Sequence, residues 1–137
     1  MKDAPWTILL LEDEPLILMD LEFAATDRGC EALCATSCSE GLRAIEQTPW
    51  IHVAILDVSL KGGETCAAVA RELDERGIPY LLHSGNLDRH NETVRRLDAP
   101  LLAKPASAEK VVAAALRLAA DKPWFPPSGG PGTALAA

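Results

Sequence analysis

The chain alternates short, wholly apolar runs with longer amphipathic segments. Four of the apolar runs end on polar side chains: residues 8–11 on Glu12 and Asp13, 53–56 on Asp57, 80–82 on His83 and Ser84, and 101–103 on Lys104. A run that is apolar at every position is typical of a strand buried on both faces. If the runs are parallel strands, three acids, a hydroxyl and a lysine meet where open α/β sheets bind ligands.

Five strand–helix units are predicted within the first 120 residues. Strands are expected at 7–11, 31–35, 51–56, 78–83 and 100–103, and helices at 15–28, 40–47, 64–76 and 107–120. Ser39 and Ser107 are the predicted N-caps of the second and last helices. The polar stretch 86–98 supports at most a short helix near 88–97.

Strands that alternate with helices at this spacing predict a doubly wound parallel sheet with right-handed crossovers. Five units suit the flavodoxin-like (βα)5 α/β fold with strand order 2-1-3-4-5. In that order the four strands with polar ends are neighbours. Residues 1–120 are therefore expected to form one domain, and the Pro- and Gly-rich residues 121–137 a flexible tail. Within it, Trp124 and Phe125 are candidates for folding back or for docking a partner.

Composition narrows the class of protein. Apolar residues make up 48% and charged residues 24%, which is typical of a globular domain. The absence of a membrane-length apolar stretch and of a leader pattern predicts a soluble cytoplasmic protein without a membrane partner. The net charge of −7 argues against direct binding of nucleic acid.

Four cysteines, Cys30, Cys34, Cys38 and Cys66, offer two readings. Three recur every four residues, but the segment that carries them is predicted to be extended at 31–36, where this spacing separates side chains along the strand. A zinc or disulfide role is the alternative to small buried packing thiols in a reducing compartment. Packing is the expectation.

The polar ends also match a known family in residue type, order and spacing. Over residues 6–120 the chain resembles the receiver domain of two-component response regulators, on the strength of Glu12, Asp13, Asp57, Ser84, Lys104 and Pro105. The segment Leu-Asp-Val-Ser-Leu-Lys-Gly-Gly at 56–63 is similar to stand-alone receivers of the alphaproteobacterial type.

This resemblance implies a phosphoryl-transfer role. Asp57 would accept a phosphoryl group from a sensor histidine kinase or a histidine phosphotransfer protein. Mg²⁺ would be bound directly by Asp13 and Asp57, by Glu12 through water, and by the backbone carbonyl of Ser59. Lys104 would pair with phosphoryl oxygens.

Two further expectations come from the family. The Ser84 hydroxyl would move to the aspartyl phosphate, and the bond between Lys104 and Pro105 would be cis. The chemistry of the residues agrees with the family roles, because a carboxylate attacks an anionic phosphoryl group only where cations offset the repulsion. Three close carboxylates without metal should also raise at least one pKa.

Some positions depart from the family pattern. Leu101 stands where many receivers carry an aromatic residue that couples to the moving hydroxyl, so signalling is expected to use the loop 85–98 instead. Ser59 and Asn86, which would flank the phosphoryl group, are small and polar and leave room for an attacking water. Self-dephosphorylation is therefore expected.

The first predicted helix has two apolar stripes. Ile17, Leu18, Leu21, Ala24 and Ala25 should face the sheet. Leu16, Met19 and Phe23 form a second stripe, for which contact with the kinase or phosphotransfer protein and packing against the last helix are both open.

The predicted function is a single-domain response regulator that signals to a separate protein and is not an enzyme. It could also serve only as a phosphate sink for a kinase. Two alternatives are an unphosphorylated adaptor with a receiver fold, and a hydrolase with an aspartyl-phosphate intermediate. The hydrolase generally needs a second acid two residues after the nucleophile, where this chain has Ser59.

Overall fold

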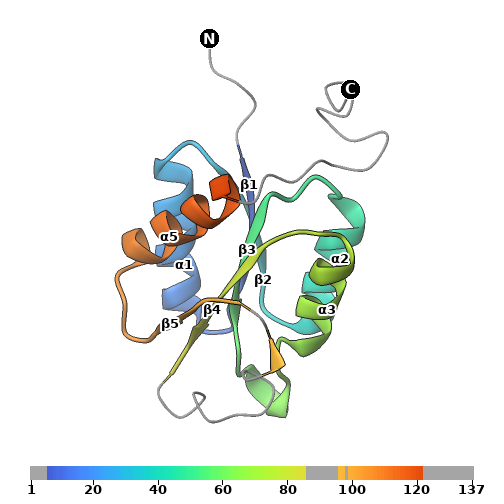
Figure 1. Ribbon diagram of the computed structural model, residues 1–137. Helices are drawn as coiled ribbons and strands as arrows, with labels where there is room; N and C mark the ends of the chain where they lie inside the picture. The colour runs from blue at the N-terminus through green and yellow to red at the C-terminus, as the bar shows by residue number, and fades with distance from the viewer. Residues whose placement is uncertain (1–5, 86–95, 98, 122–137) are drawn as a thin grey trace, which may run out of the picture.

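The structure, a computed structural model, describes residues 6–85, 96, 97 and 99–121. One sheet lies between two layers of helices (Figure 1). Its strands are β1 (Thr7–Leu11), β2 (Glu31–Ala35), β3 (Val53–Asp57), β4 (Tyr80–Ser84) and β5 (Leu101–Ala103). The helices in this part of the chain are α1 (Pro15–Asp27), α2 (Cys38–Gln47), α3 (Ala67–Glu75), α5 (Ala108–Asp121) and the 3-10 helix η1 (Lys61–Gly63).

The strand order is β2-β1-β3-β4-β5, and every neighbouring pair is parallel. Helices α1 and α5 cover one face of the sheet, and α2 and α3 cover the other (Figure 1). This is the flavodoxin-like arrangement that the alternating pattern predicts. This strand order also determines where the candidate site lies, because it places β1, β3, β4 and β5, the strands that end on polar residues, side by side.

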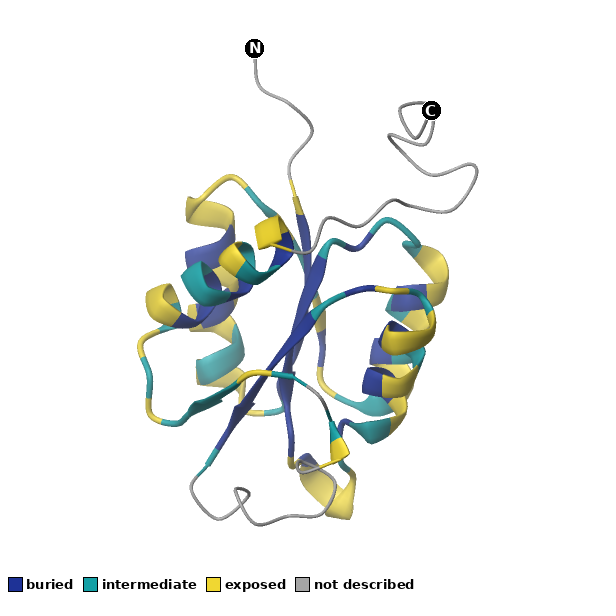
Figure 2. Ribbon diagram, in the orientation of Figure 1, coloured by how far each residue is buried: buried dark blue, intermediate teal, exposed yellow. Residues whose placement is uncertain are grey.

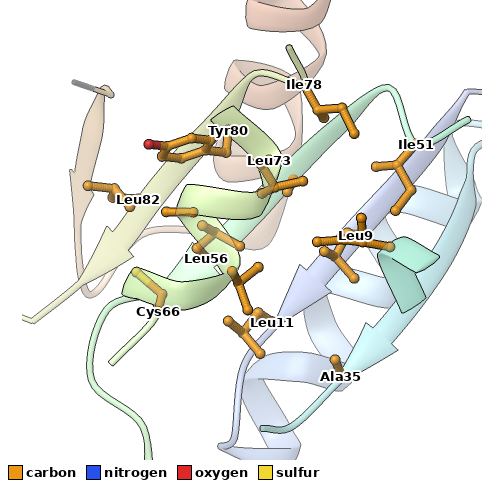
Figure 3. Close-up of a cluster of buried hydrophobic side chains, with 14 of the residues drawn as sticks. Leu9, Leu11, Ala35, Ile51, Leu56, Cys66, Leu73, Ile78, Tyr80 and Leu82 are labelled. Atoms are coloured by element: carbon orange, nitrogen blue, oxygen red, sulfur yellow. The ribbon is translucent and has the colours of Figure 1, made fainter. Parts of the chain in front are cut away.

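The strand interiors form two hydrophobic clusters, one on each face. Every residue of β1 and β3 is buried (Figure 2). Since successive side chains of a strand point to opposite faces, Ile8 and Leu10 join the cluster under α1 and α5, and Leu9 and Leu11 join the one under α2 and α3. Figure 3 shows Leu9 and Leu11 in the second cluster, which also holds Leu73 of α3. Burial on both faces explains the wholly apolar runs.

The start of α2 differs from the prediction. Its N-cap is Ser37, whose Oγ accepts the N–H of Glu40 at 3.2 Å, so Ser39 lies inside the helix. The Glu40 carboxylate in turn accepts the N–H of Thr36 at 2.7 Å. This reciprocal pair satisfies two backbone donors at the helix start, which Ser39 two residues later would not do.

Helix α3 begins at Ala67, three residues after the predicted start. The intervening residues form η1 and an antiparallel bridge between Ser59 and Thr65, which hold the chain away from helical geometry. The start of α5 is as predicted, with Ser107 Oγ accepting the N–H of Lys110 at 3.2 Å.

Several predictions fall on residues that the structure does not describe. Residues 86–95 and 98 include Asn86 and most of the predicted helix at 88–97, and residues 122–137 include Trp124 and Phe125. These predictions lie outside the described residues. Within them, no helix combines the length and apolar character that a membrane crossing requires.

The expectation of buried packing cysteines is only partly correct. None of the four cysteines forms a disulfide in the described part of the chain, and Cys66 is buried in the cluster under α2 and α3. Cys34, however, is exposed, and it lies on the edge strand β2, where Glu31 is exposed as well. Partial desolvation of its sulfur and the nearby charge of Glu22 nevertheless raise the pKa of Cys34 to about 11, which makes its thiol a poor nucleophile.

Candidate functional site

The carboxyl ends of four neighbouring strands assemble the site. Glu12 and Asp13 directly follow β1, Asp57 ends β3, and Lys104 directly follows β5. These four side chains come together as predicted from their positions after apolar runs. Ser84, the last residue of β4, lies at the same edge and is buried.

The three acids form a compact cluster. Glu12, Asp13 and Asp57 each offer a carboxylate oxygen, and these oxygens lie within 4.8 Å of one another. In the described part of the chain, no other group of His, Cys, Asp and Glu meets this geometry. Glu12 is 0% and Asp57 4% exposed, whereas Asp13 is half-buried. The cluster is therefore open to solvent on the side of Asp13.

Lys104 is the cation of the site. Its Nζ lies 3.2 Å from Glu12 Oε1 and 3.4 Å from Asp57 Oδ1. Burial lowers the pKa of Lys104, but the charges of Asp57 and Glu12 outweigh burial and raise the pKa above its usual value. Lys104 therefore stays protonated at physiological pH.

Asp57 carries the largest perturbation among the acids. Burial raises its pKa, the charge of Glu12 raises it further, and Lys104 partly opposes both, which leaves a value of about 7. One cation facing two buried carboxylates leaves a negative charge in a site of low polarity. The site is thus poised for a second cation.

The cluster can hold a divalent metal ion. Glu12 Oε1 is buried and accepts no hydrogen bond from the described residues, although it is close to Lys104. Glu12 Oε2 accepts the N–H of Glu14 at 3.1 Å, and Asp13 Oδ2 accepts the N–H of Lys61 at 2.6 Å. A set of carboxylate oxygens with free lone pairs suits a hard cation such as Mg²⁺.

Ser84 and two of the residues expected to modulate the site, Ser59 and Leu101, belong to the described part of the chain. The Ser84 hydroxyl donates to the carbonyl of Gly85 at 3.0 Å. Ser59 is exposed, and Leu101 is half-buried against the cluster under α2 and α3. The peptide bond between Lys104 and Pro105 is cis, as the family resemblance implies. Asn86 is outside the described residues.

His83 is a feature of the site for which the sequence suggested no role. His83 of β4 lies directly beside Asp57 of β3 in the register of these paired strands, and it is only 3% exposed. Burial, and secondarily the charge of Lys104, lower its pKa to about 4. The only sequence signal was a histidine inside an apolar run, and the pairing with Asp57 depends on a non-local register.

His83 also lines a cavity of about 170 Å³ between α1 and the segment that joins β5 to α5. Apolar side chains form most of its wall, with Asp20 and Lys104 as the charged members. Neither ring nitrogen of His83 has a hydrogen-bond partner within the described ranges. The cavity adjoins the acidic cluster through Lys104.

The two apolar stripes of α1 differ in how far their side chains are exposed. Leu21, Ala24 and Ala25 are buried and Ile17 and Leu18 pack beside them, as predicted for the sheet-facing stripe. The second stripe is exposed, with fractions of 71% for Leu16, 56% for Met19 and 75% for Phe23. The alternative that this stripe packs against the last helix is therefore contradicted by the structure.

Comparisons with known proteins address the fold and the family. No protein-family model and no curated protein matches the chain. Among solved structures, SdrG from Sphingomonas melonis Fr1 is 35% identical, with a TM-score of 0.71 over 87% of this chain and 99% of that one.

Two further structures are explicitly receivers. A response regulator receiver domain protein from Clostridium thermocellum is 26% identical, with a TM-score of 0.72 over 85% of this chain and 94% of that one. A response regulator receiver protein from Sinorhizobium medicae WSM419, 24% identical, shares the fold with a TM-score of 0.73 over 86% and 97%. With strand order, acidic cluster and lysine in agreement, the chain belongs to the response regulator receiver domain family.

Proposed function

We propose that the protein is a single-domain response regulator that accepts a phosphoryl group on Asp57 from a sensor histidine kinase or phosphotransfer protein. The observation that carries this proposal is the position of Asp57. Its buried carboxylate lies 3.4 Å from Lys104 Nζ and within 4.8 Å of Glu12 and Asp13. A nucleophilic carboxylate needs cationic charge on both sides of the transferring group, and this arrangement provides for two cations.

The residues divide the work of transfer. A Mg²⁺ bound directly by Asp13 and Asp57, by Glu12 through water and by the Ser59 carbonyl would supply the second positive charge. An oxygen of Asp57 attacks phosphorus while the bond to the donor histidine breaks. Lys104 leaves its ion pair with Glu12 and Asp57 only as far as needed to hold a phosphoryl oxygen, so the charges are already oriented before transfer.

The phosphorylated state would differ from the free state in a few contacts. The Ser84 hydroxyl exchanges the Gly85 carbonyl for a phosphoryl oxygen, which biases an existing two-state equilibrium. Because Leu101 cannot play the part of an aromatic switch, the change travels through the segment 85–98 to a separate target protein. Ser59 and Asn86 admit water, so the phosphate is lost by self-hydrolysis.

The phosphodonor would dock on the exposed stripe of α1. Leu16, Met19 and Phe23 are large apolar side chains with little cover, and α1 starts beside the acidic cluster. Exposed apolar groups that gather on one helix are typical of a protein-binding surface. We place this exchange in the cytoplasm, without direct contact to nucleic acid, in keeping with the net charge of −7.

The decisive experiment is intact-mass spectrometry after incubation with Mg²⁺ and acetyl phosphate or phosphoramidate. Wild type should gain one phosphate that is labile in base, and Asp57→Asn should gain none. Asp20→Asn, which removes an exposed acid of α1, is the matched control and should be phosphorylated like wild type. If neither these donors nor a phosphorylated histidine kinase gives an adduct on wild type, the unphosphorylated adaptor becomes the better description.

The donor surface has its own test. Leu16→Glu and Met19→Glu should slow transfer from a phosphorylated kinase or phosphotransfer protein while leaving phosphorylation by phosphoramidate unchanged. A small donor needs no docking surface, so it reports on the site alone. Normal protein-to-protein transfer by both variants would remove the stripe from the proposal.

A further inference from the structure

The segment between the phosphoacceptor strand and α3 folds into a small hairpin, residues 58–66. Cys66 N–H donates to the Val58 carbonyl at 3.1 Å, and Leu60 N–H donates to the Glu64 carbonyl at 2.8 Å. The bridge between Ser59 and Thr65 lies between these hydrogen bonds. The tip is η1, where Gly62 has a φ of 75°, a left-handed conformation that favours glycine.

The tip of this hairpin is tied to the acidic cluster. The backbone N–H of Lys61 donates to Asp13 Oδ2 at 2.6 Å, across 48 positions of sequence. A hydrogen bond from N–H to an ionised carboxylate is short and strong. The other two acids are held differently, because Glu12 and Asp57 face Lys104. Asp13 therefore connects the cluster to the hairpin that follows the nucleophile.

We propose that the Lys61 backbone N–H is a positioning group that competes with a divalent cation for the charge of Asp13. The inference rests on the proposed function, in which Asp13 is a metal ligand. A cation at Asp13 withdraws electron density from the carboxylate, so the hydrogen bond to Lys61 weakens when metal binds. By linkage, the hydrogen bond must weaken metal binding by the same factor.

The consequence extends to the far side of the hairpin. Glu64 Oε1 accepts the N–H of Cys38 at 3.3 Å, and the Cys38 thiol lies 2.8 Å from the Thr65 carbonyl. These contacts join the hairpin to the first residue of α2. Metal occupancy thus acts on a segment that touches the helix layer opposite α1, away from the proposed donor surface.

A pair of substitutions isolates the N–H. Lys61→Ala keeps the backbone donor, whereas replacing Lys61 by lactic acid, the α-hydroxy analogue of alanine, turns the amide into an ester and removes the donor without adding an atom beside Asp13. Both replacements remove the same ammonium charge. We expect the ester variant to bind Mg²⁺ about 3- to 10-fold more tightly than Lys61→Ala, the factor for losing one hydrogen bond of ordinary net strength. Calorimetric titration of the unphosphorylated proteins measures the two dissociation constants.

A second measurement needs no variant. In wild type the Lys61 amide proton should exchange with solvent faster, and its NMR resonance should move upfield, when Mg²⁺ is added. Equal or weaker binding by the ester variant than by Lys61→Ala, or slower amide exchange with Mg²⁺, would overturn the competition and show that the hydrogen bond only orients Asp13. If wild type binds no Mg²⁺ at all, the metal role in the proposed function fails as well.

Discussion

The two ends of the sheet differ in whether their polar side chains have hydrogen-bond partners. At the amino end, Thr7 N–H donates to His52 Nδ1 at 3.0 Å, Trp6 stacks on the same ring at 5.7 Å, and Tyr80 OH donates to Asp74 at 3.1 Å. At the carboxyl end, an oxygen of Glu12 and both ring nitrogens of His83 are buried without a hydrogen bond from any described residue.

The difference separates stability from function. Polar groups at the amino end are satisfied by neighbours within the fold, so they contribute to stability. Those at the carboxyl end are buried with incomplete compensation, and the pKa of about 7 for Asp57 reflects that cost. Under the proposed function, a metal ion and a phosphoryl group would relieve this unfavourable burial. Among the described residues, the buried side-chain oxygen and nitrogen atoms without a hydrogen-bond partner all belong to Glu12 and His83, at the carboxyl end.

The largest change in the free energy of unfolding should come from a substitution in the apolar middle of the strands, between the two ends of the sheet. Leu56→Ala removes a side chain that is fully buried beneath α3, and should lower the free energy of unfolding by about 2–5 kcal/mol. Urea denaturation monitored by circular dichroism measures the loss. Leu16→Ala, at an exposed position, should change it by less than about 0.5 kcal/mol. If Leu56→Ala lowered the free energy of unfolding no more than Leu16→Ala, the burial of Leu56 in the cluster under α2 and α3 would be contradicted.

At the carboxyl end, removing a charge should stabilise the protein. Without metal at pH 8, Asp57→Asn should raise the free energy of unfolding by about 2–4 kcal/mol, since the pKa of Asp57 is about three units above its unfolded value of 3.8 and each unit corresponds to at most about 1.4 kcal/mol. The carboxyl ionises near 3.8 when unfolded and near 7 when folded, so wild type loses stability as the pH rises between these values. The advantage of asparagine should therefore shrink below pH 7 and disappear near pH 4.

Denaturation of both proteins in EDTA across this pH range measures the effect. Excess Mg²⁺ should reduce the advantage of Asp57→Asn, because metal binds the folded wild type and stabilises it. An asparagine variant that is less stable than wild type at pH 8 without metal would show that Lys104 fully compensates the buried acids.

At the amino end, removing a polar group should have the opposite sign. Tyr80→Phe deletes the hydroxyl that donates to Asp74 and should lower the free energy of unfolding by about 1 kcal/mol. Equilibrium denaturation at pH 7 suffices for the measurement. A stabilising Tyr80→Phe would erase the contrast between the two ends of the sheet.

The exposed stripe of α1 should give the smallest effect on stability. Phe23→Ser changes a side chain that is 75% exposed, so the free energy of unfolding should stay within about 0.5 kcal/mol of wild type. The thermal midpoint of the purified variant is a sufficient measure. A marked loss would mean that Phe23 packs against residues beyond those described.

Sequence patterns predicted the buried strands and the polar residues at their ends. They did not predict features that depend on backbone geometry or on which residues are neighbours in space. The wholly apolar runs ending at Asp57 and Lys104 predicted buried strands, because burial on both faces dictates such a run. The strand order 2-1-3-4-5 was predicted from the five strand–helix units, and it brings the polar ends of the strands together. The cap at Ser37 was missed because Ser39 has the same chemistry and only the backbone geometry chooses between them. The exposure of Cys34 and the pairing of His83 with Asp57 follow from sheet position, which no local pattern encodes.

The site also has a place in the order of synthesis. Its acids come early in the chain, but Lys104 follows the last strand, 92 positions after Glu12. A nascent chain on the ribosome therefore contains Glu12, Asp13 and Asp57 well before Lys104 has been synthesised. Because β5 must dock on β4 before Lys104 can reach Asp57, the ion pair between them, and with it the proposed phosphoryl transfer, requires that all five strands have assembled.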